Sequence, residues 1–319
     1  MNYYKKFRES VSSETFQIIS IASGLIIMGI FFTCSSPYFF NVDNLLNVAL
    51  QTSIIAIIAI GQTYVIITGG IDLSIGSIMA LSGVISALCM NAGIDVGTSM
   101  VLGILAGCAI GALNGVLIVF GRLPPFIATL GTMSIARGIA LLITNGIPIS
   151  GLPDSFGFFG NDSVLGIPFP VILMIVLTMI FGYILKNTRL GIHTYACGSN
   201  LEAARLSGIN TKLTIFIIYI SSAFLASIAG LIFASRIVSG QPSAGAGYEL
   251  YSVASSVIGG TNLMGGEGMV TGALLGALVI GVLRNGLNLL GISAFTQEVL
   301  IGVVIILAVY ADRIKHRRN

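Results

Sequence analysis

Long apolar runs separated by short polar segments make up most of this 319-residue chain. A helix needs about 20 mostly apolar residues to cross the hydrocarbon of a bilayer. Nine runs qualify, at residues 16–34, 46–68, 74–90, 98–120, 125–144, 168–185, 213–235, 269–290 and 294–311. The pattern predicts an all-α membrane protein that crosses the bilayer many times.

The positions of the basic residues change the count of crossings. Lys and Arg residues next to membrane helices stay on the cytoplasmic side, and both ends of the chain are basic. We therefore expect cytoplasmic tails at 1–15 and 312–319, which an odd number of crossings cannot give. The missing segment is expected at 248–266, an apolar stretch that ends in glycines and suits a half-span or a tilted span. The prediction is a single transmembrane domain over 1–319, with about ten segments, some short or glycine-broken.

The composition agrees with a lipid-embedded chain. Only 8% of the residues are charged and 55% are hydrophobic, whereas soluble domains carry about 25% charged residues. Membrane lipid is therefore the expected surroundings of most of the surface. The net charge of +3 is too small to indicate a nucleic-acid partner.

One polar, basic segment, 186–212, is long enough to form a structure of its own between two spans. Ser199 or Asn200 could cap a short helix with the sequence LEAARLS, because their side chains accept hydrogen bonds from the first free amides of a helix. Gly208 would then end that helix. A short surface helix held between spans could act as a lever for a cytoplasmic partner, although an ordinary solvated loop would have the same residues.

Two glycine-rich segments interrupt the apolar runs and share the pattern Gly-Gly-x-(Asp/Asn)-Leu-x-x-Gly, which indicates a faint internal repeat. Glycine-broken segments at corresponding positions of two halves point to the route of a transporter. Their free amides and carbonyls must face protein or water. The candidates for the route or its gate are Gly69, Gly70 and Asp72 in the first segment, and Gly259, Gly260 and Asn262 in the second.

Two interpretations of Asp72 stay open at this point. Its carboxylate could line the route or hold a hinge, or it could cap a helix that begins near Leu73. Other polar residues in apolar surroundings could line the route or join helices to each other. They are Gln62, Asn145, Asn285 and Asn288.

Two arginines, Arg137 and Arg284, lie well inside apolar runs. A charge at the centre of a bilayer costs at least about 2.5–3.5 kcal/mol, so each needs a partner or water. We expect Arg284 to form a structural ion pair with Glu298 across the short turn between their two runs. The sequence suggests no partner for Arg137.

Several segments resemble known permeases. Glu202-Ala203-Ala204, followed three residues later by Gly208, resembles the EAA-x3-G signature of binding-protein-dependent ABC importer permeases. The longer ending of that signature is missing, which favours one branch of the family. Four other segments resemble ribose-type sugar permeases: GGIDLSIGS at 69–77, QPSAGAGYEL at 241–250, VIGGTNL at 257–263 and NGLNLLG at 285–291.

The resemblance implies a permease subunit in the inner membrane of a bacterium, working with a second copy of itself. A cytoplasmic ATPase, which binds ATP and magnesium, would dock on a coupling helix within 186–212. An extracytoplasmic sugar-binding protein would deliver the substrate. The implied ATPase-coupling residues are Glu202, Ala203, Ala204, Arg205 and Gly208.

The chain carries no GxxxxGK[ST] phosphate-binding loop, no cluster with metal-ligand spacing and no nucleophile–base set. We therefore expect neither catalysis nor a cofactor or metal in this chain. The predicted function is ATP-driven import of ribose or a related monosaccharide by alternating access. The alternatives are a branched-chain amino acid or sugar-like signal as substrate, or an ion-coupled transporter that uses Asp72 or Glu298 as its carboxylate.

Overall fold

The computed structural model describes residues 13–317 of the chain, and almost all of its regular structure is helical. Most of the predicted tail at 1–15 lies outside the described residues, as do positions 318 and 319. The rest of the predicted C-terminal tail, 312–317, continues the last helix. In the described part, the only strands are β1 (Ser163–Val164) and β2 (Ile167–Pro168), which have two residues each and form an antiparallel hairpin.

Each of the ten predicted membrane segments contains a helix, and the largest shortfall is in 248–266, where the helix ends at Ile258. These helices are α2 (Ser13–Ser35), α3 (Val42–Ile67), α4 (Ile75–Asn91), α5 (Val96–Val119), α6 (Pro125–Thr144), α8 (Phe169–Asn187), α11 (Thr211–Arg236), α12 (Tyr248–Ile258), α13 (Val270–Leu289) and α14 (Ala294–Arg317). Four short elements connect them: η1 (Asp154–Gly157), α7 (Phe158–Asn161), α9 (Arg189–Ser199) and α10 (Leu201–Leu206).

The helices differ in whether they can cross a membrane. Seven are long and apolar enough, namely α2, α3, α5, α6, α8, α11 and α13, whereas α4 and the apolar part of α14, Ala294–Val304, are shorter. Helix α12 has 11 residues, which rise about 16 Å, roughly half of the hydrocarbon thickness. The segment 248–266 is therefore a half-length helix followed by a loop. The count of ten crossings and the cytoplasmic side of both termini stay predictions.

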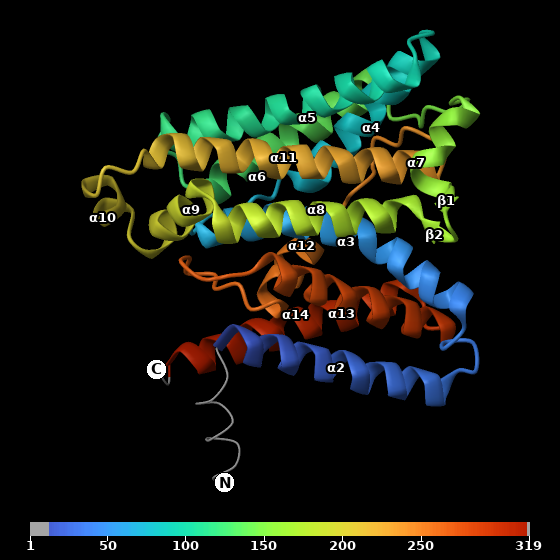
Figure 1. The fold of residues 1–319 in the computed structure, drawn as a ribbon. Helices are drawn as coiled ribbons and strands as arrows, with labels where there is room; N and C mark the ends of the chain where they lie inside the picture. Colours follow the sequence, from blue (N-terminus) through green and yellow to red (C-terminus); the bar gives the residue numbers. More distant parts are fainter. Residues whose placement is uncertain (1–12, 318–319) are drawn as a thin grey trace.

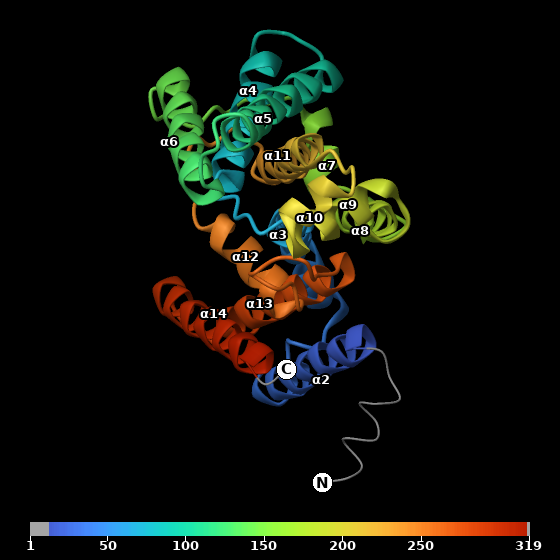
Figure 2. The ribbon, with the colours of Figure 1, turned by 90° about the vertical axis from the view of Figure 1, so that its left-hand side faces the viewer.

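The beginning of α2 and the end of α14 lie at the same end of the bundle as α9 and α10 (Figure 1). Helix α7 and the β1–β2 hairpin lie at the opposite end. Viewed along the bundle, α3 lies in the middle, with α4, α5 and α6 to one side and α2, α13 and α14 to the other (Figure 2). The basic segment between α8 and α11 is thus at the end that holds both described chain ends.

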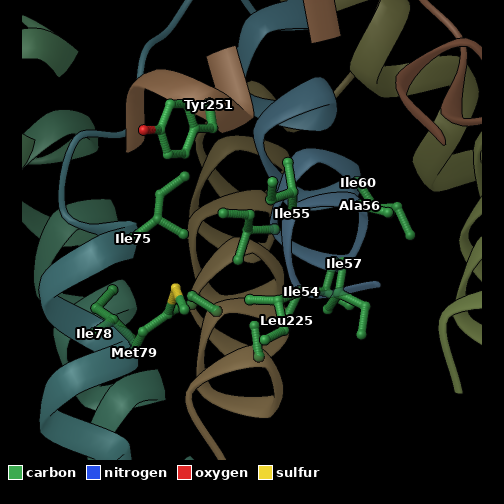
Figure 3. Packing of buried hydrophobic residues seen from close by; sticks show 14 of the residues in the cluster. Ile54, Ile55, Ala56, Ile57, Ile60, Ile75, Ile78, Met79, Leu225 and Tyr251 are labelled. Atoms are coloured by element: carbon green, nitrogen blue, oxygen red, sulfur yellow. The ribbon is translucent and has the colours of Figure 1, made fainter. Parts of the chain in front are cut away.

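Helix α3 is central because its second half is apolar on all sides, and a helix of that kind is stable only when protein surrounds it. Every residue from 52 to 67 is buried. Figure 3 shows Ile55 of α3 near Ile75 and Met79 of α4, Leu225 of α11 and Tyr251 of α12. This cluster packs α3 against α4, α11 and α12.

Helices α5 and α11 pack closely through glycines that recur every fourth residue of α5. A Cβ atom at Gly111 would lie 2.7 Å from the carbonyl oxygen of Tyr219, and one at Gly115 would lie 2.6 Å from the ring of Phe216. Small residues at such positions let helix backbones approach each other within a membrane. Any larger side chain there must push the two helices apart.

We predict that Gly111→Leu lowers the thermal stability of the purified protein, because overpacking a close contact costs about 1–3 kcal/mol. Gly138→Leu is the matched control, since a Cβ atom at Gly138, also in a membrane helix, meets nothing within 4 Å. Size-exclusion profiles after heating in detergent measure the effect. Equal losses in the two variants would contradict the close packing of α5 on α11.

Candidate functional site

The first glycine-rich segment breaks the chain between α3 and α4. Helix α3 ends at Ile67, and Gly69 follows with a φ of +80°, a backbone conformation that glycine adopts readily. Helix α4 begins at Ile75, two residues later than predicted, with Ser74 as its N-cap. The break is inside the protein, because Asp72 and Ser74 are both fully buried.

Asp72 uses both of its carboxylate oxygens within the chain. Oδ1 accepts hydrogen bonds from the amide of Ser74 at 2.9 Å and from its hydroxyl at 2.6 Å. Oδ2 accepts from the hydroxyl of Ser222 in α11 at 3.0 Å. Asp72 therefore closes a turn onto Ser74, the N-cap residue of α4, and at the same time fastens that residue to α11.

The backbone of the break is held from two further helices. With its amide oriented to satisfy both groups, Gln62 of α3 donates to the carbonyl of Asp72 at 3.1 Å and accepts from its amide at 3.3 Å. The hydroxyl of Thr129 in α6 donates to the carbonyl of Ile71 at 3.0 Å. The backbone groups of Asp72 and the carbonyl of Ile71 are thus paired by side chains.

Two residues that the sequence interpretation overlooked extend this network. The amide of Asn114 in α5 donates to the hydroxyl of Ser74 at 2.8 Å, and the hydroxyl of Thr132 in α6 donates to the side-chain oxygen of Asn114. All three are fully buried. Their signal in the sequence is weak: each is one polar residue inside an apolar run. We call Gln62, Asp72, Ser74, Asn114, Thr129, Thr132 and Ser222 the Asp72 network.

The second glycine-rich segment shares one local hydrogen bond with the first. Helix α12 ends at Ile258, and Gly260 follows with a φ of +90°. The side-chain oxygen of Asn262 accepts from the amide of Met264 at 2.9 Å, as Asp72 does from the amide two residues after it. The faint sequence repeat therefore corresponds to one shared side-chain hydrogen bond, whereas the left-handed residue is the first glycine of one pair, Gly69, and the second of the other, Gly260. Asn262 is only half-buried.

The two breaks touch each other and α9. The amide of Gly266 donates to the carbonyl of Ile67, the last residue of α3, at 2.8 Å. Gly198 of α9 lies so close that a Cβ atom there would be 2.6 Å from the Gly266 nitrogen. The hydroxyl of Tyr195, also in α9, donates to the carbonyl of Gly268 at 2.7 Å. The segment between α8 and α11 is thus in direct contact with both breaks.

The QPSAGAGYEL segment also packs on the first break. Gly245 has a φ of +70°, and a Cβ atom there would lie 3.0 Å from the Cα of Gly76. Arg137 of α6 donates to the carbonyl of Pro242 at 2.7 Å and to that of Ala244 at 2.6 Å. The partners of this membrane arginine are therefore backbone carbonyls, and they tie the segment to α6.

Helix α10 forms where the sequence predicts a short helix, with Asn200 as its cap, accepting from the amide three residues on. Gly208 follows its end with a φ of +84°. Glu202 and Arg205 pair at 2.6 Å with about two thirds of each side chain exposed. The hydrogen bond and charge of Arg205 lower the pKa of Glu202. Ala204 faces inward, so α10 presents a charged face outward.

The remaining predicted residues lie away from the Asp72 network. Asn285 of α13 exchanges two amide hydrogen bonds with Asn44 of α3, at 3.0 and 2.9 Å, and so joins these helices. Asn145 is exposed and ends α6 in a left-handed conformation, with a φ of 51°. Asn288 is exposed near the end of α13. Nothing in the structure brings these three residues into one group.

The predicted ion pair of Arg284 and Glu298 is wrong, because Tyr251 of α12 lies between them. The Arg284 guanidinium lies over the Tyr251 ring, 5.0 Å from its centre, and the Tyr251 hydroxyl donates to Glu298 at 2.6 Å. An aromatic ring thus replaces the expected direct contact.

Comparison with known proteins shows the family of the chain. Residues 44–309 match the family described as "Branched-chain amino acid transport system / permease component", and the chain belongs to this family. It is 45% identical over 300 residues to the ribose import permease protein RbsC of Escherichia coli K12, covering 93% of each chain. It is 46% identical to RbsC of Bacillus subtilis, covering 92% of this chain and 91% of the relative. No solved structure matches.

A third relative differs in the sugar that its name carries. The D-allose transport system permease protein AlsC of Escherichia coli K12 is 40% identical over 290 residues, which is 91% of this chain and 89% of the relative. The chain is thus a multi-pass membrane permease of the ribose type, as the four segments in the sequence indicate.

We predict that Asp72→Ala destabilises the protein strongly. The substitution leaves buried hydrogen-bond donors of Ser74 and Ser222 without their acceptor, and each such loss costs about 1–3 kcal/mol. Asn262→Ala, the corresponding change in the second break, removes one bond at a half-buried position and is expected to cost less. Thermal denaturation in detergent compares the two, and a larger loss for Asn262→Ala would contradict the assignment.

Proposed function

We propose that this chain is the transmembrane permease subunit of an ATP-driven importer that moves ribose or a related monosaccharide across the cytoplasmic membrane of a bacterium. Membership of the permease family and the names of the relatives support the class of protein and of substrate. The observation that carries the mechanism is the contact of α9 with both glycine breaks, through Gly198 and Gly266.

Two copies of the chain work with a cytoplasmic ATPase and an extracytoplasmic sugar-binding protein. The ATPase binds ATP and magnesium and docks on α10, whose Glu202 and Arg205 side chains are exposed. When the ATPase closes, α10 and α9 move together. Since α9 packs directly against Ile67 and Gly266, that movement reaches the ends of α3 and of the loop after α12 without an intervening flexible segment.

A branched-chain amino acid is the second candidate substrate, because the description of the matched family names that class. The relatives named for ribose and allose favour a sugar. An ion-coupled mechanism has less support. A carboxylate that binds protons or sodium during transport needs free oxygens, whereas those of Asp72 are both engaged in hydrogen bonds within the chain.

Uptake of labelled solutes tests the substrate class. Cells that express the chain with its ATPase and binding protein are compared with cells that lack only this chain, using ribose, allose, arabinose, glucose and leucine. We expect uptake of ribose or a related sugar to depend on the chain, and leucine uptake to be unchanged. Dependence for leucine alone would favour the second candidate, and no dependence for any sugar would overturn the proposal.

We predict that Glu202→Lys and Gly208→Asp each remove most of the uptake while leaving the amount of protein in the membrane unchanged. The first reverses the charge of the exposed face of α10, and the second places a side chain at a φ of +84°. Asp162→Lys is the control, because it reverses an exposed charge at the opposite end of the bundle. Normal uptake in both α10 variants would contradict the proposal that the ATPase docks on α10.

A further inference from the structure

A groove of about 460 Å³ lies where α8, α9 and α13 meet the beginning of α2. Its walls combine two kinds of side chain. Ile18, Met179, Leu185 and Val270 supply an apolar surface, while Lys186 and Asn187 supply polar groups. It lies at the end of the bundle that holds α10, and no step of the proposed transport mechanism uses it.

The two kinds of lining are separated by depth. Lys186 and Asn187 are close to the end of α8, directly before the polar segment that contains α9 and α10. Met179 lies seven residues earlier on α8, which is about 10 Å deeper along the axis of the helix. The groove therefore has a basic and amide-bearing mouth at the membrane–water boundary and an apolar wall within the hydrocarbon.

The groove opens toward lipid on the α8 side. Met179 is 68% exposed and Tyr183 is 64% exposed, one helical turn apart on the same face. Helix α2 lies on the other side of the groove, and only 6% of its apolar part is buried in the protein. A molecule that reaches the groove along this face must itself be apolar along most of its length.

We propose that this groove binds a phospholipid with an anionic headgroup. The Lys186 ammonium pairs with the headgroup phosphate, and the Asn187 amide donates to it. One acyl chain lies along Met179 and beside Gly182, where no side chain fills the space. Basic groups between membrane helices at the cytoplasmic boundary are suited to anionic headgroups, and the charge of Lys186 stays in the interface as this long side chain allows.

The surroundings place the headgroup at Lys186 rather than further in. A second pocket of about 240 Å³ adjoins the groove and shares Tyr195 and Met269 with it, but it is also lined by Glu267. A carboxylate repels a phosphate, and Glu267 already takes part in an interaction within the chain. A free sugar or phosphate ion has no apolar part to contact the apolar wall, which accounts for most of the groove.

The test uses the full chain, purified in detergent and then mixed with phosphatidylglycerol, with phosphatidylcholine or with inorganic phosphate. Native mass spectrometry counts the bound lipid, and thermal denaturation measures stabilisation, because a ligand that binds only the folded state raises its melting temperature. We expect phosphatidylglycerol to bind and stabilise more than phosphatidylcholine, and phosphate alone to have no effect. Equal effects of the two lipids, or full stabilisation by phosphate, would overturn the proposal.

Two variants and one control locate the site. Lys186→Gln is expected to remove the preference for phosphatidylglycerol, whereas Lys212→Gln is expected to keep it, since Lys212 lies 5.8 Å from the Phe120 ring and outside the groove. Gly182→Leu is expected to reduce binding of both lipids. A Cβ atom there meets only Val270, at 3.9 Å, so the new side chain starts in open space at the groove wall.

These variants keep the result interpretable. Lys186 is exposed, so its replacement tests the site even if Gly182→Leu is poorly folded. Unchanged lipid preference in Lys186→Gln, or the same loss in Lys212→Gln, contradicts the assignment. None of these readouts requires transport, so the outcome is independent of the uptake experiment.

Discussion

The unpaired backbone of a broken helix is the constraint on which the rest of this structure depends. Between α3 and α4 the regular hydrogen bonds stop, and in a membrane protein the freed amides and carbonyls need partners from the protein or from water. Here Gln62 and Thr129 bind the backbone of the break, and the carboxylate of Asp72 binds the start of α4. The partners come from four helices, so the break also holds those helices together.

The same break is connected to the surface that the proposed ATPase contacts. Ile67 is the last residue of α3, and its carbonyl accepts the hydrogen bond of Gly266 beside Gly198 of α9. The end of α3 therefore lies between the Asp72 network and the glycine contact with α9, and in the proposed mechanism a movement of α9 displaces it. Asn262 makes one side-chain hydrogen bond within the second break, which is also tied to α3 through Gly266 and to α9 through Gly268.

Much of this arrangement could be predicted from the sequence, because it depends on local patterns. Apolar runs gave the helices within a few residues, and the capping preference of Asn200 and the turn preference of Gly208 defined α10. The half length of α12 was one of two options that the glycines left open. The hydrogen bond that Asp72 and Asn262 each accept from the amide two residues on follows from one shared motif.

Contacts between distant helices could not be predicted in the same way. Asn114 is a lone polar residue in an apolar run, and only the packing of α5 against α4 brings it to Ser74. Arg137 binds backbone carbonyls, and because every residue has a carbonyl, the sequence does not indicate which ones an arginine will contact. Arg284 and Glu298 have opposite charges and lie close in sequence, yet the ring of Tyr251 comes between them because α12 packs against both α13 and α14.

Hydrogen exchange of the backbone amides between α3 and α4 tests the central claim most directly. If the Asp72 network pairs the broken backbone, the peptide covering residues 68–74 should exchange about as slowly as the adjoining buried turns of α3 and α4. The exposed segment 150–151, for whose amides the structure gives no hydrogen-bond acceptor, supplies the fast-exchanging reference in the same sample. Exchange of 68–74 as fast as that reference would contradict the account.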